Sequence, residues 1–120
     1  MAEPSRPKAR CILIVEDEYL LAADLAQSLE DTGANVLGPA ASVGKALELI
    51  GSRQDIDCAV LDVNLGSEKV YPVAQALRHR GVRFVFATSY DDWIIPIDFR
   101  DFPRLEKPID TTALLRVLCS

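Results

Sequence analysis

Short apolar runs alternate with amphipathic stretches along most of the chain. Each run is bounded by Gly, Pro or charged residues, which is typical of a buried strand. Because several runs are apolar without interruption, and not alternately apolar and polar, we expect strands covered on both faces, as in a parallel sheet. The predicted strands lie at residues 11–15, 34–37, 59–61, 82–87 and 103–106.

The segments that connect these runs have apolar residues at helical spacing. Leu21, Leu25 and Leu29 recur at every fourth position and predict a helix that ends at Gly33. Three further helices are predicted, one capped by Ser42, one from about Tyr71 to His79, and one from about Asp110.

The remaining connection, at residues 90–100, has no clear helical period. It contains Pro96, which would interrupt a long helix. The chain is therefore interpreted as five strand–helix units in which the fourth helix is degraded. Alternation at this period predicts an α/β fold with a doubly wound, five-stranded parallel sheet.

Composition narrows the class of protein. A length of 120 residues suits one domain at residues 11–120, preceded by a flexible tail at residues 1–10. The net charge of −5 argues against direct contact with nucleic acid or an anionic membrane. Cys11, Cys58 and Cys119 are an odd number without metal-ligand spacing, so neither a disulfide framework nor a zinc site is expected. No apolar segment is long enough for a membrane span. Because the cysteines suggest no disulfide framework and the polar N-terminus has no apolar signal region, we infer a reducing cytoplasm.

Polar side chains follow four of the five predicted strands. They are Glu16 and Asp17, Asp62, Thr88, and Lys107. From its own strand, Asp62 could equally cap the next turn, but parallel strands bring their carboxyl ends to one crevice. Three carboxylates at such short distances repel one another unless a cation lies among them. Oxygen ligands favour Mg²⁺ as that cation. Together with an ammonium and a hydroxyl for an anionic guest, the set predicts phosphoryl transfer to or from a carboxylate.

Four segments carry a resemblance to a known family. They are Ile-Leu-Ile-Val-Glu-Asp-Glu at 12–18, Leu-Asp-Val-Asn-Leu at 61–65, Ala-Thr-Ser at 87–89 and Glu-Lys-Pro at 106–108. In this order, at strand ends, they resemble the receiver domain of two-component response regulators. The resemblance extends from Cys11 to Leu118. It implies a flavodoxin-like sheet with strand order 2-1-3-4-5 and a role in bacterial phosphorelay signal transduction.

The resemblance also implies a role for each site residue. Asp62 is the expected phosphoacceptor, taking its phosphoryl group from a phosphohistidine of a sensor histidine kinase. Thr88 is expected to donate its hydroxyl to a phosphoryl oxygen, and Lys107 to pair first with Asp62 and then with the phosphoryl group. The expected Mg²⁺ ligands are Glu16, Asp17, Asp62 and the backbone carbonyl of Asn64.

Neighbouring positions receive secondary roles. Asn64, two residues after the acceptor, and Tyr90, two after Thr88, occupy places that line the path of the hydrolytic water in the family. We expect them to tune the lifetime of the phosphoryl group, although simple packing explains Tyr90 equally well. Glu18 is expected to cap the first helix, where a carboxylate offsets the helix dipole. The Lys107–Pro108 peptide is often cis in the family.

Two features depart from the family pattern. An aromatic residue usually stands three positions before the Lys, and Arg104 occupies that position here. The segment 88–107 is also shorter than usual, which puts the usual switch through the fourth helix and that aromatic in question. The run Phe-Val-Phe-Ala-Thr-Ser-Tyr at 84–90 resembles an atypical subgroup with a Phe-Ala-Thr-Gly-Tyr-like motif. Its members are typically single-domain and associated with particular histidine kinase families.

Apolar side chains gather in the irregular connection. The favoured interpretation is that they roof the core where a helix is missing, and the alternative is an exposed patch for a homodimer or for kinase docking. His79, between Arg78 and Arg80, is interpreted as a solvated helix end. The apolar set is Trp93, Ile94, Ile95, Ile97, Phe99 and Phe102.

Three functions compete. The favoured one is a signalling switch, not an enzyme, that acts by binding an unknown downstream protein or by relaying phosphate between kinases. A small phosphatase with an aspartyl intermediate is the second, but it usually needs a carboxylate where Asn64 stands. An unphosphorylated scaffold is the third, and it is weakened because all the expected site residues are present.

Overall fold

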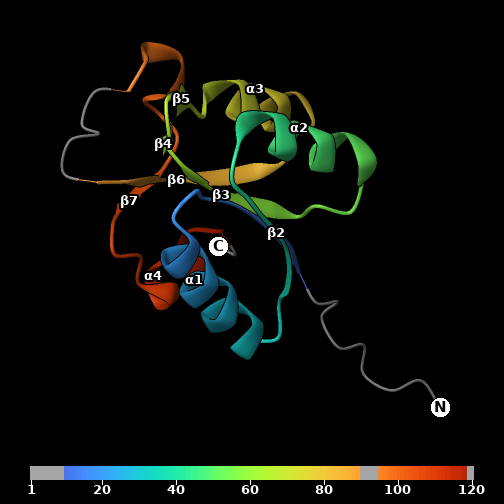
Figure 1. The fold of residues 1–120 in the computed structure, drawn as a ribbon, viewed down its shortest axis with the longest axis vertical. Coiled ribbons are helices and arrows are strands. Elements are labelled where there is room, and N and C mark those ends of the chain that lie inside the picture. Colours follow the sequence, from blue (N-terminus) through green and yellow to red (C-terminus); the bar gives the residue numbers. More distant parts are fainter. Residues whose placement is uncertain (1–9, 90–94, 119–120) are drawn as a thin grey trace.

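The computed structural model describes residues 10–89 and 95–118, which form a parallel sheet with helices on both faces (Figure 1). The order across the five-stranded sheet is β2-β1-β3-β6-β7, and all neighbouring pairs are parallel. The predicted doubly wound fold and strand order are confirmed. The strands are β1 (Cys11–Val15), β2 (Asn35–Ala40), β3 (Cys58–Asp62), β6 (Arg83–Thr88) and β7 (Arg104–Glu106).

Two pairs of helices cover the sheet. In Figure 1, α1 and α4 lie below it, and α2 and α3 lie above it. No helix in the described part of the chain is both long enough and apolar enough to cross a membrane. The helices are α1 (Tyr19–Asp31), α2 (Val43–Ser52), α3 (Tyr71–His79) and α4 (Thr111–Leu118).

Strand β1 shows why its sequence is apolar throughout. Leu13 and Val15 belong to the core layer that includes residues of α2 and α3. Ile12 and Ile14 belong to the opposite layer, together with Leu29 of α1. Successive side chains of a strand point to opposite faces, so a strand covered on both sides buries every side chain. All five residues of β1 are buried.

Strand β2 is longer than expected. The predicted strand ended before Gly38, whereas β2 continues through Gly38 and Pro39 to Ala40. Gly38 has a φ of 96°, and a Cβ atom there would lie 2.8 Å from the carbonyl oxygen of Ile14. Only glycine fits this close approach. The Ala40 carbonyl accepts a 2.9 Å hydrogen bond from the amide of Glu16, which ties β2 to the start of the site.

A small hairpin follows β3 where only a loop was predicted. Strands β4 (Asn64–Leu65) and β5 (Glu68–Lys69) pair antiparallel, with Asn64 opposite Lys69. The turn consists of Gly66 and Ser67, and Gly66 has a φ of 62°. A two-residue turn with Gly first is a common hairpin connection, so the Gly-Ser pair was the signal that could have revealed it.

The degraded fourth helix is replaced by aromatic packing. The described part of this connection contains one short 3₁₀ turn, η1 (Ile97–Phe99). Phe99 is buried and stacks on Tyr71, with 5.5 Å between ring centroids, and Phe102 stacks on Phe84 at 4.5 Å. The roof interpretation is therefore confirmed for Ile95, Phe99 and Phe102, whereas Ile97 is exposed. Trp93 and Ile94 lie outside the described residues.

Helix ends follow the sequence signals in part. The Ser42 hydroxyl accepts a 3.1 Å hydrogen bond from the amide of Lys45, which confirms the predicted cap of α2. His79 is exposed at the end of α3, as predicted. Glu18 occupies the N-cap position of α1, but its side chain makes no capping hydrogen bond, so the prediction that it would cap this helix is wrong in that respect.

Candidate functional site: an acidic crevice with one lysine

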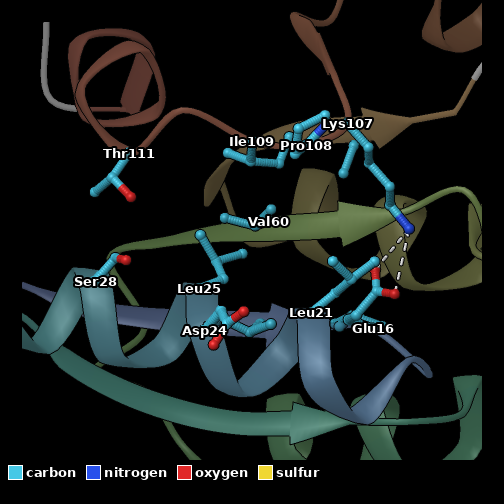
Figure 2. A pocket seen from close by; sticks show the side chains of 13 residues that line it. Glu16, Leu21, Asp24, Leu25, Ser28, Val60, Lys107, Pro108, Ile109 and Thr111 are labelled. Carbon is cyan, nitrogen blue, oxygen red and sulfur yellow. Dashed lines mark hydrogen bonds and ion pairs between the residues drawn. The ribbon is translucent and has the colours of Figure 1, made fainter.

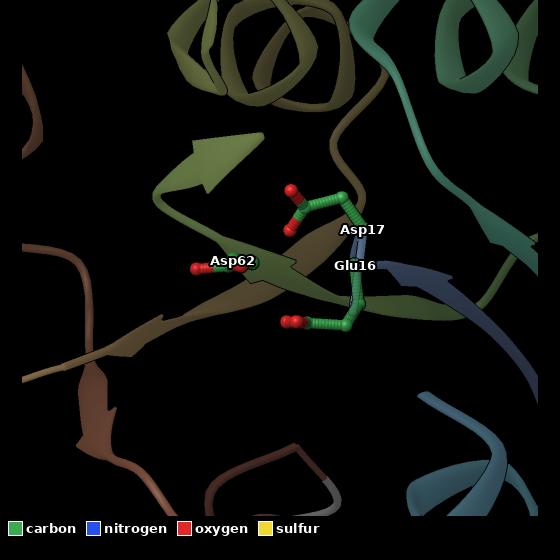
Figure 3. A group of neighbouring side chains, drawn as sticks. All are labelled: Glu16, Asp17 and Asp62. Carbon is green, nitrogen blue, oxygen red and sulfur yellow. The ribbon is translucent and has the colours of Figure 1, made fainter. Parts of the chain in front are cut away.

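Three carboxylates meet at the carboxyl edge of the sheet. Glu16 and Asp17 directly follow β1, and Asp62 is the last residue of β3. One carboxylate oxygen from each lies within 4.8 Å of the others, and Figure 3 shows the three side chains grouped at the ends of β1 and β3. Asp62 and Glu16 are buried, whereas Asp17 is exposed. Neighbouring parallel strands hold them together because β1 and β3 end at the same edge.

Lys107 brings one positive charge to this cluster. Its Nζ lies 3.0 Å from Asp62 Oδ2 and 3.0 Å from Glu16 Oε2, and 4.0 Å from Glu18 Oε1. The Lys107 amide donates a 2.7 Å hydrogen bond to the carbonyl of Thr88, which fixes the start of the side chain next to β6. The Lys107–Pro108 peptide is cis, as the resemblance to the family implied.

Charge in the crevice is unbalanced. Burial, and then the hydrogen bond and charge of Glu16, raise the pKa of Asp62 to about 7, although Lys107 opposes the shift. Burial lowers the pKa of Lys107, but its hydrogen bonds to Asp62 and Glu16 outweigh this effect and raise it. With a pKa of about 7, Asp62 is protonated in about half of the molecules at neutral pH. A protonated carboxyl is a poor nucleophile, so a second cation in the site would increase the share of the nucleophilic form.

The donor set fits a hard divalent cation. The three carboxylates supply oxygen ligands only, and Mg²⁺ prefers such ligands together with water and phosphate oxygens. With three carboxylates facing one ammonium, a divalent ion would neutralise the remaining negative charge. Asp17, the exposed member, is held by a 2.9 Å hydrogen bond from the amide of Gly66 to its Oδ2. The turn of the β4–β5 hairpin thus orients one candidate ligand.

Thr88 and Asn64 make different hydrogen bonds near the acceptor Asp62. Thr88 is buried, and its Oγ1 donates to the carbonyl of Leu105 at 3.4 Å, so it is engaged with β7. The amide of Asn64 donates to Asp62 Oδ1 at 3.3 Å, and its side-chain oxygen accepts a hydrogen bond from Lys69. Lys69 was not predicted from the sequence, because its approach depends on the hairpin. Tyr90 lies outside the described residues.

A cavity adjoins the crevice but is a different kind of site. It has a volume of about 150 Å³, and Glu16 and Lys107 stand at one end (Figure 2). Leu21 and Leu25 of α1 and Ile109 contribute apolar walls. A charged phosphoryl group would lose its hydration there without enough polar partners, so the acidic crevice is the better anion and metal site.

The pKa of Asp62 predicts an unusual pH dependence of stability. In the folded protein its pKa is about 7 against an ordinary 3.8, so the folded state binds this proton more tightly than the unfolded state. In EDTA, the free energy of unfolding should therefore fall as pH rises from about 5.5 to about 8. The expected decrease is about 1–2 kcal/mol, because solvent near the partly open site screens the charge of Asp62. Urea unfolding of the wild type and Asp62→Asn measures this term, which the variant should lack.

Magnesium supplies the second arm of that experiment. Because ionised Asp62 is needed to bind it, Mg²⁺ should stabilise the wild type more at about pH 8 than at about pH 5.5. Parallel pH curves for wild type and Asp62→Asn in EDTA would contradict the assigned pKa.

Comparison with known proteins identifies relatives of the chain. The family model described as the response regulator receiver domain matches residues 12–118. The solution structure of SdrG from Sphingomonas melonis Fr1 has 40% identity and a TM-score of 0.82, covering 96% of this chain and 100% of that chain. The BeF3-activated conformation of SdrG from Pseudomonas melonis Fr1 has 42% identity and a TM-score of 0.75, covering 94% and 97%.

A more distant structure gives the same fold. The CheY-like response regulator receiver domain from Methylobacillus flagellatus has 26% identity and a TM-score of 0.79, covering 93% of this chain and 98% of that chain. No curated protein sequence matched the chain.

Proposed function

Because the chain belongs to the response regulator receiver domain family, we propose that it takes a phosphoryl group from a sensor histidine kinase onto Asp62, with Mg²⁺ bound in the acidic crevice. The observation that carries the proposal is the position of Asp62. It lies buried at the end of β3, 3.0 Å from Lys107 and beside two further carboxylates. Glu16 is also buried, 3.0 Å from Lys107 and beside the same cluster, so the choice of Asp62 rests in addition on its place in the Leu-Asp-Val-Asn-Leu segment at 61–65 that resembles the family's acceptor motif.

The proposed transfer is a single displacement at phosphorus. An oxygen of ionised Asp62 forms a bond to the phosphorus of a phosphohistidine. The bond between phosphorus and the imidazole nitrogen breaks, and its electron pair returns to the imidazole. Bound Mg²⁺ supplies charge neutralisation between the acceptor and the phosphoryl oxygens. Glu16, Asp17, Asp62 and the backbone carbonyl of Asn64 are the proposed ligands.

The chain's own residues would stabilise the product. Lys107, already at Asp62 Oδ2, would shift its hydrogen bond to a phosphoryl oxygen and offset negative charge there. Thr88 would have to leave the carbonyl of Leu105, which it now contacts at 3.4 Å, to donate to the phosphoryl group. That exchange removes a hydrogen bond between β6 and β7, so phosphorylation would change the structure at this edge of the sheet.

The output is proposed to be a change in binding to a downstream protein or a relay of the phosphoryl group. Arg104 stands in place of the family's aromatic residue and is exposed at the start of β7. A different group must therefore respond to phosphorylation and change the binding surface. Phe99, in the connection between β6 and β7, stacks on Tyr71 at the start of α3, and this stack is the proposed place for such a response. The buried thiols of Cys11 and Cys58 support the proposed cytoplasmic location.

Labelling by a small donor tests the proposal. Acetyl phosphate with Mg²⁺ should add one phosphoryl group to the wild-type protein, detected by intact mass. EDTA should reduce the rate by at least about tenfold, because the charge that opposes attack is then not neutralised. Labelling that is absent with Mg²⁺, or equally fast in EDTA, would contradict the proposal. Multiple turnover of a phosphomonoester would instead favour the phosphatase alternative.

A further inference from the structure

Lys69 and Asn64 face each other across the hairpin that follows the acceptor strand. They are directly paired in the register of β4 and β5, and Lys69 Nζ donates a hydrogen bond to Asn64 Oδ1. The turn at Gly66 fixes this pairing, because a two-residue connection leaves no freedom of register. The lysine therefore reaches the amide oxygen through the fold of the hairpin.

Asn64 is more exposed than the acceptor beside it. The side chain of Asp62 is only 4% exposed, whereas Asn64 is half-buried. The backbone amide of Asn64 donates to Asp62 Oδ1, which keeps the two residues in fixed relation. A water that hydrolyses a phosphoryl group on Asp62 must approach opposite the bond to the Asp62 oxygen, and therefore from the solvent, to which the half-buried Asn64 is also open.

We propose that Lys69 is a positioning residue that holds the side-chain oxygen of Asn64 away from the attacking water and so prolongs the phosphorylated state. The inference rests on the proposed function of Asp62. A charge-assisted hydrogen bond is stronger than one from neutral water, so the ammonium competes well for the amide oxygen. Once released, that oxygen can accept a hydrogen bond from the water and orient it.

The affected step is hydrolysis of the aspartyl phosphate. The water oxygen forms a bond to phosphorus, and the bond between phosphorus and the Asp62 oxygen breaks. The electron pair of that bond returns to the carboxylate. Both protons of the water end on the phosphate product, which exchanges them with solvent. Orienting the water lowers the barrier to this step without changing how the phosphoryl group arrives.

Decay of the labelled protein tests the role of Lys69. After labelling with acetyl phosphate and Mg²⁺ and removal of the donor, Lys69→Met should lose its phosphoryl group about three- to tenfold faster than wild type, as expected for one hydrogen bond. Its labelling rate should stay within about twofold of the wild-type rate. Lys69→Arg, which keeps the donor, should decay at close to the wild-type rate.

Two further variants separate positioning from charge. Lys45→Met removes a surface charge from α2, where the Lys45 side chain is 57% exposed, and should leave decay unchanged. In an Asn64→Ala background, Lys69→Met should have no effect, because the oxygen that it releases is gone. Circular dichroism and thermal melting establish that each variant is folded.

The decay rates and the labelling of the wild-type protein test the two proposals separately. Decay of Lys69→Met that equals or is slower than wild type overturns the inference, as does the same acceleration with and without Asn64. Either result leaves the proposed function intact, because labelling itself is then normal. Absence of label on wild-type protein overturns the proposed function, and the role of Lys69 with it.

Discussion

The Asp62→Asn protein is expected to take up less than about 1% of the phosphoryl label that wild type takes from acetyl phosphate and Mg²⁺. The amide has nearly the size of the carboxylate but cannot ionise, so it cannot attack phosphorus. It also removes one negative charge from a buried cluster whose members repel, and the fold should persist or gain stability in EDTA. Intact mass after equal labelling times measures the loss.

The same strand supplies a matched control for that substitution. Asp57 precedes β3 at its opposite end, and its Oδ2 accepts a 2.7 Å hydrogen bond from the amide of Cys11. Asp57→Asn retains an oxygen for this bond, and the variant should take up label at the wild-type rate. Equal loss of label in both variants would mean that disturbance of β3, and not removal of the nucleophile, explains the effect at Asp62.

Lys107→Met is expected to slow labelling by about a hundredfold. The substitution preserves length but removes the only ammonium within 4.0 Å of Asp62 among the described residues. Buried Asp62 and Glu16 then lose their shared cation, so ionised Asp62 becomes rarer and the developing phosphoryl charge is not offset on that side. Initial labelling rates at saturating Mg²⁺ measure the effect.

Metal affinity distinguishes this mechanism from simple damage to the site. At about pH 9, where Asp62 is ionised with or without the lysine, loss of a positive charge should leave Mg²⁺ binding unchanged or tighter, because the ion no longer competes with the ammonium for Asp62 and Glu16. Calorimetric titration of wild type and Lys107→Met with Mg²⁺ measures the affinity. Weaker binding together with slow labelling would indicate a collapsed crevice instead of a missing charge.

The sheet could be predicted from the sequence because parallel strands covered on both faces are apolar at every position. β1 and β3 are examples, since alternate residues enter the two core layers and none faces solvent. β7 was recognisable only by its place before the Lys-Pro pair, because two of its three residues are exposed. The end of β2 was mispredicted because Gly38 and Pro39 normally close a strand, and here a close backbone approach to Ile14 requires the glycine.

Part of the crevice was also accessible, because strand order alone brings the ends of β1 and β3 side by side. What could not be predicted depends on contacts between segments. The hairpin places Lys69 on Asn64 and the Gly66 amide on Asp17, and neither contact leaves a mark beyond a Gly-Ser pair. The stacking of Tyr71 on Phe99 depends on how an irregular segment folds back over α3, which has no periodic signal.

Chemical trapping of the acceptor tests the central claim most directly. Borohydride reduces an aspartyl phosphate to homoserine, so the wild-type protein can be labelled with acetyl phosphate and Mg²⁺, reduced, digested and sequenced by mass spectrometry. The proposed function predicts homoserine at position 62 and at no other aspartate. Homoserine elsewhere, or an unchanged Asp62 in protein that carries the label, would contradict it.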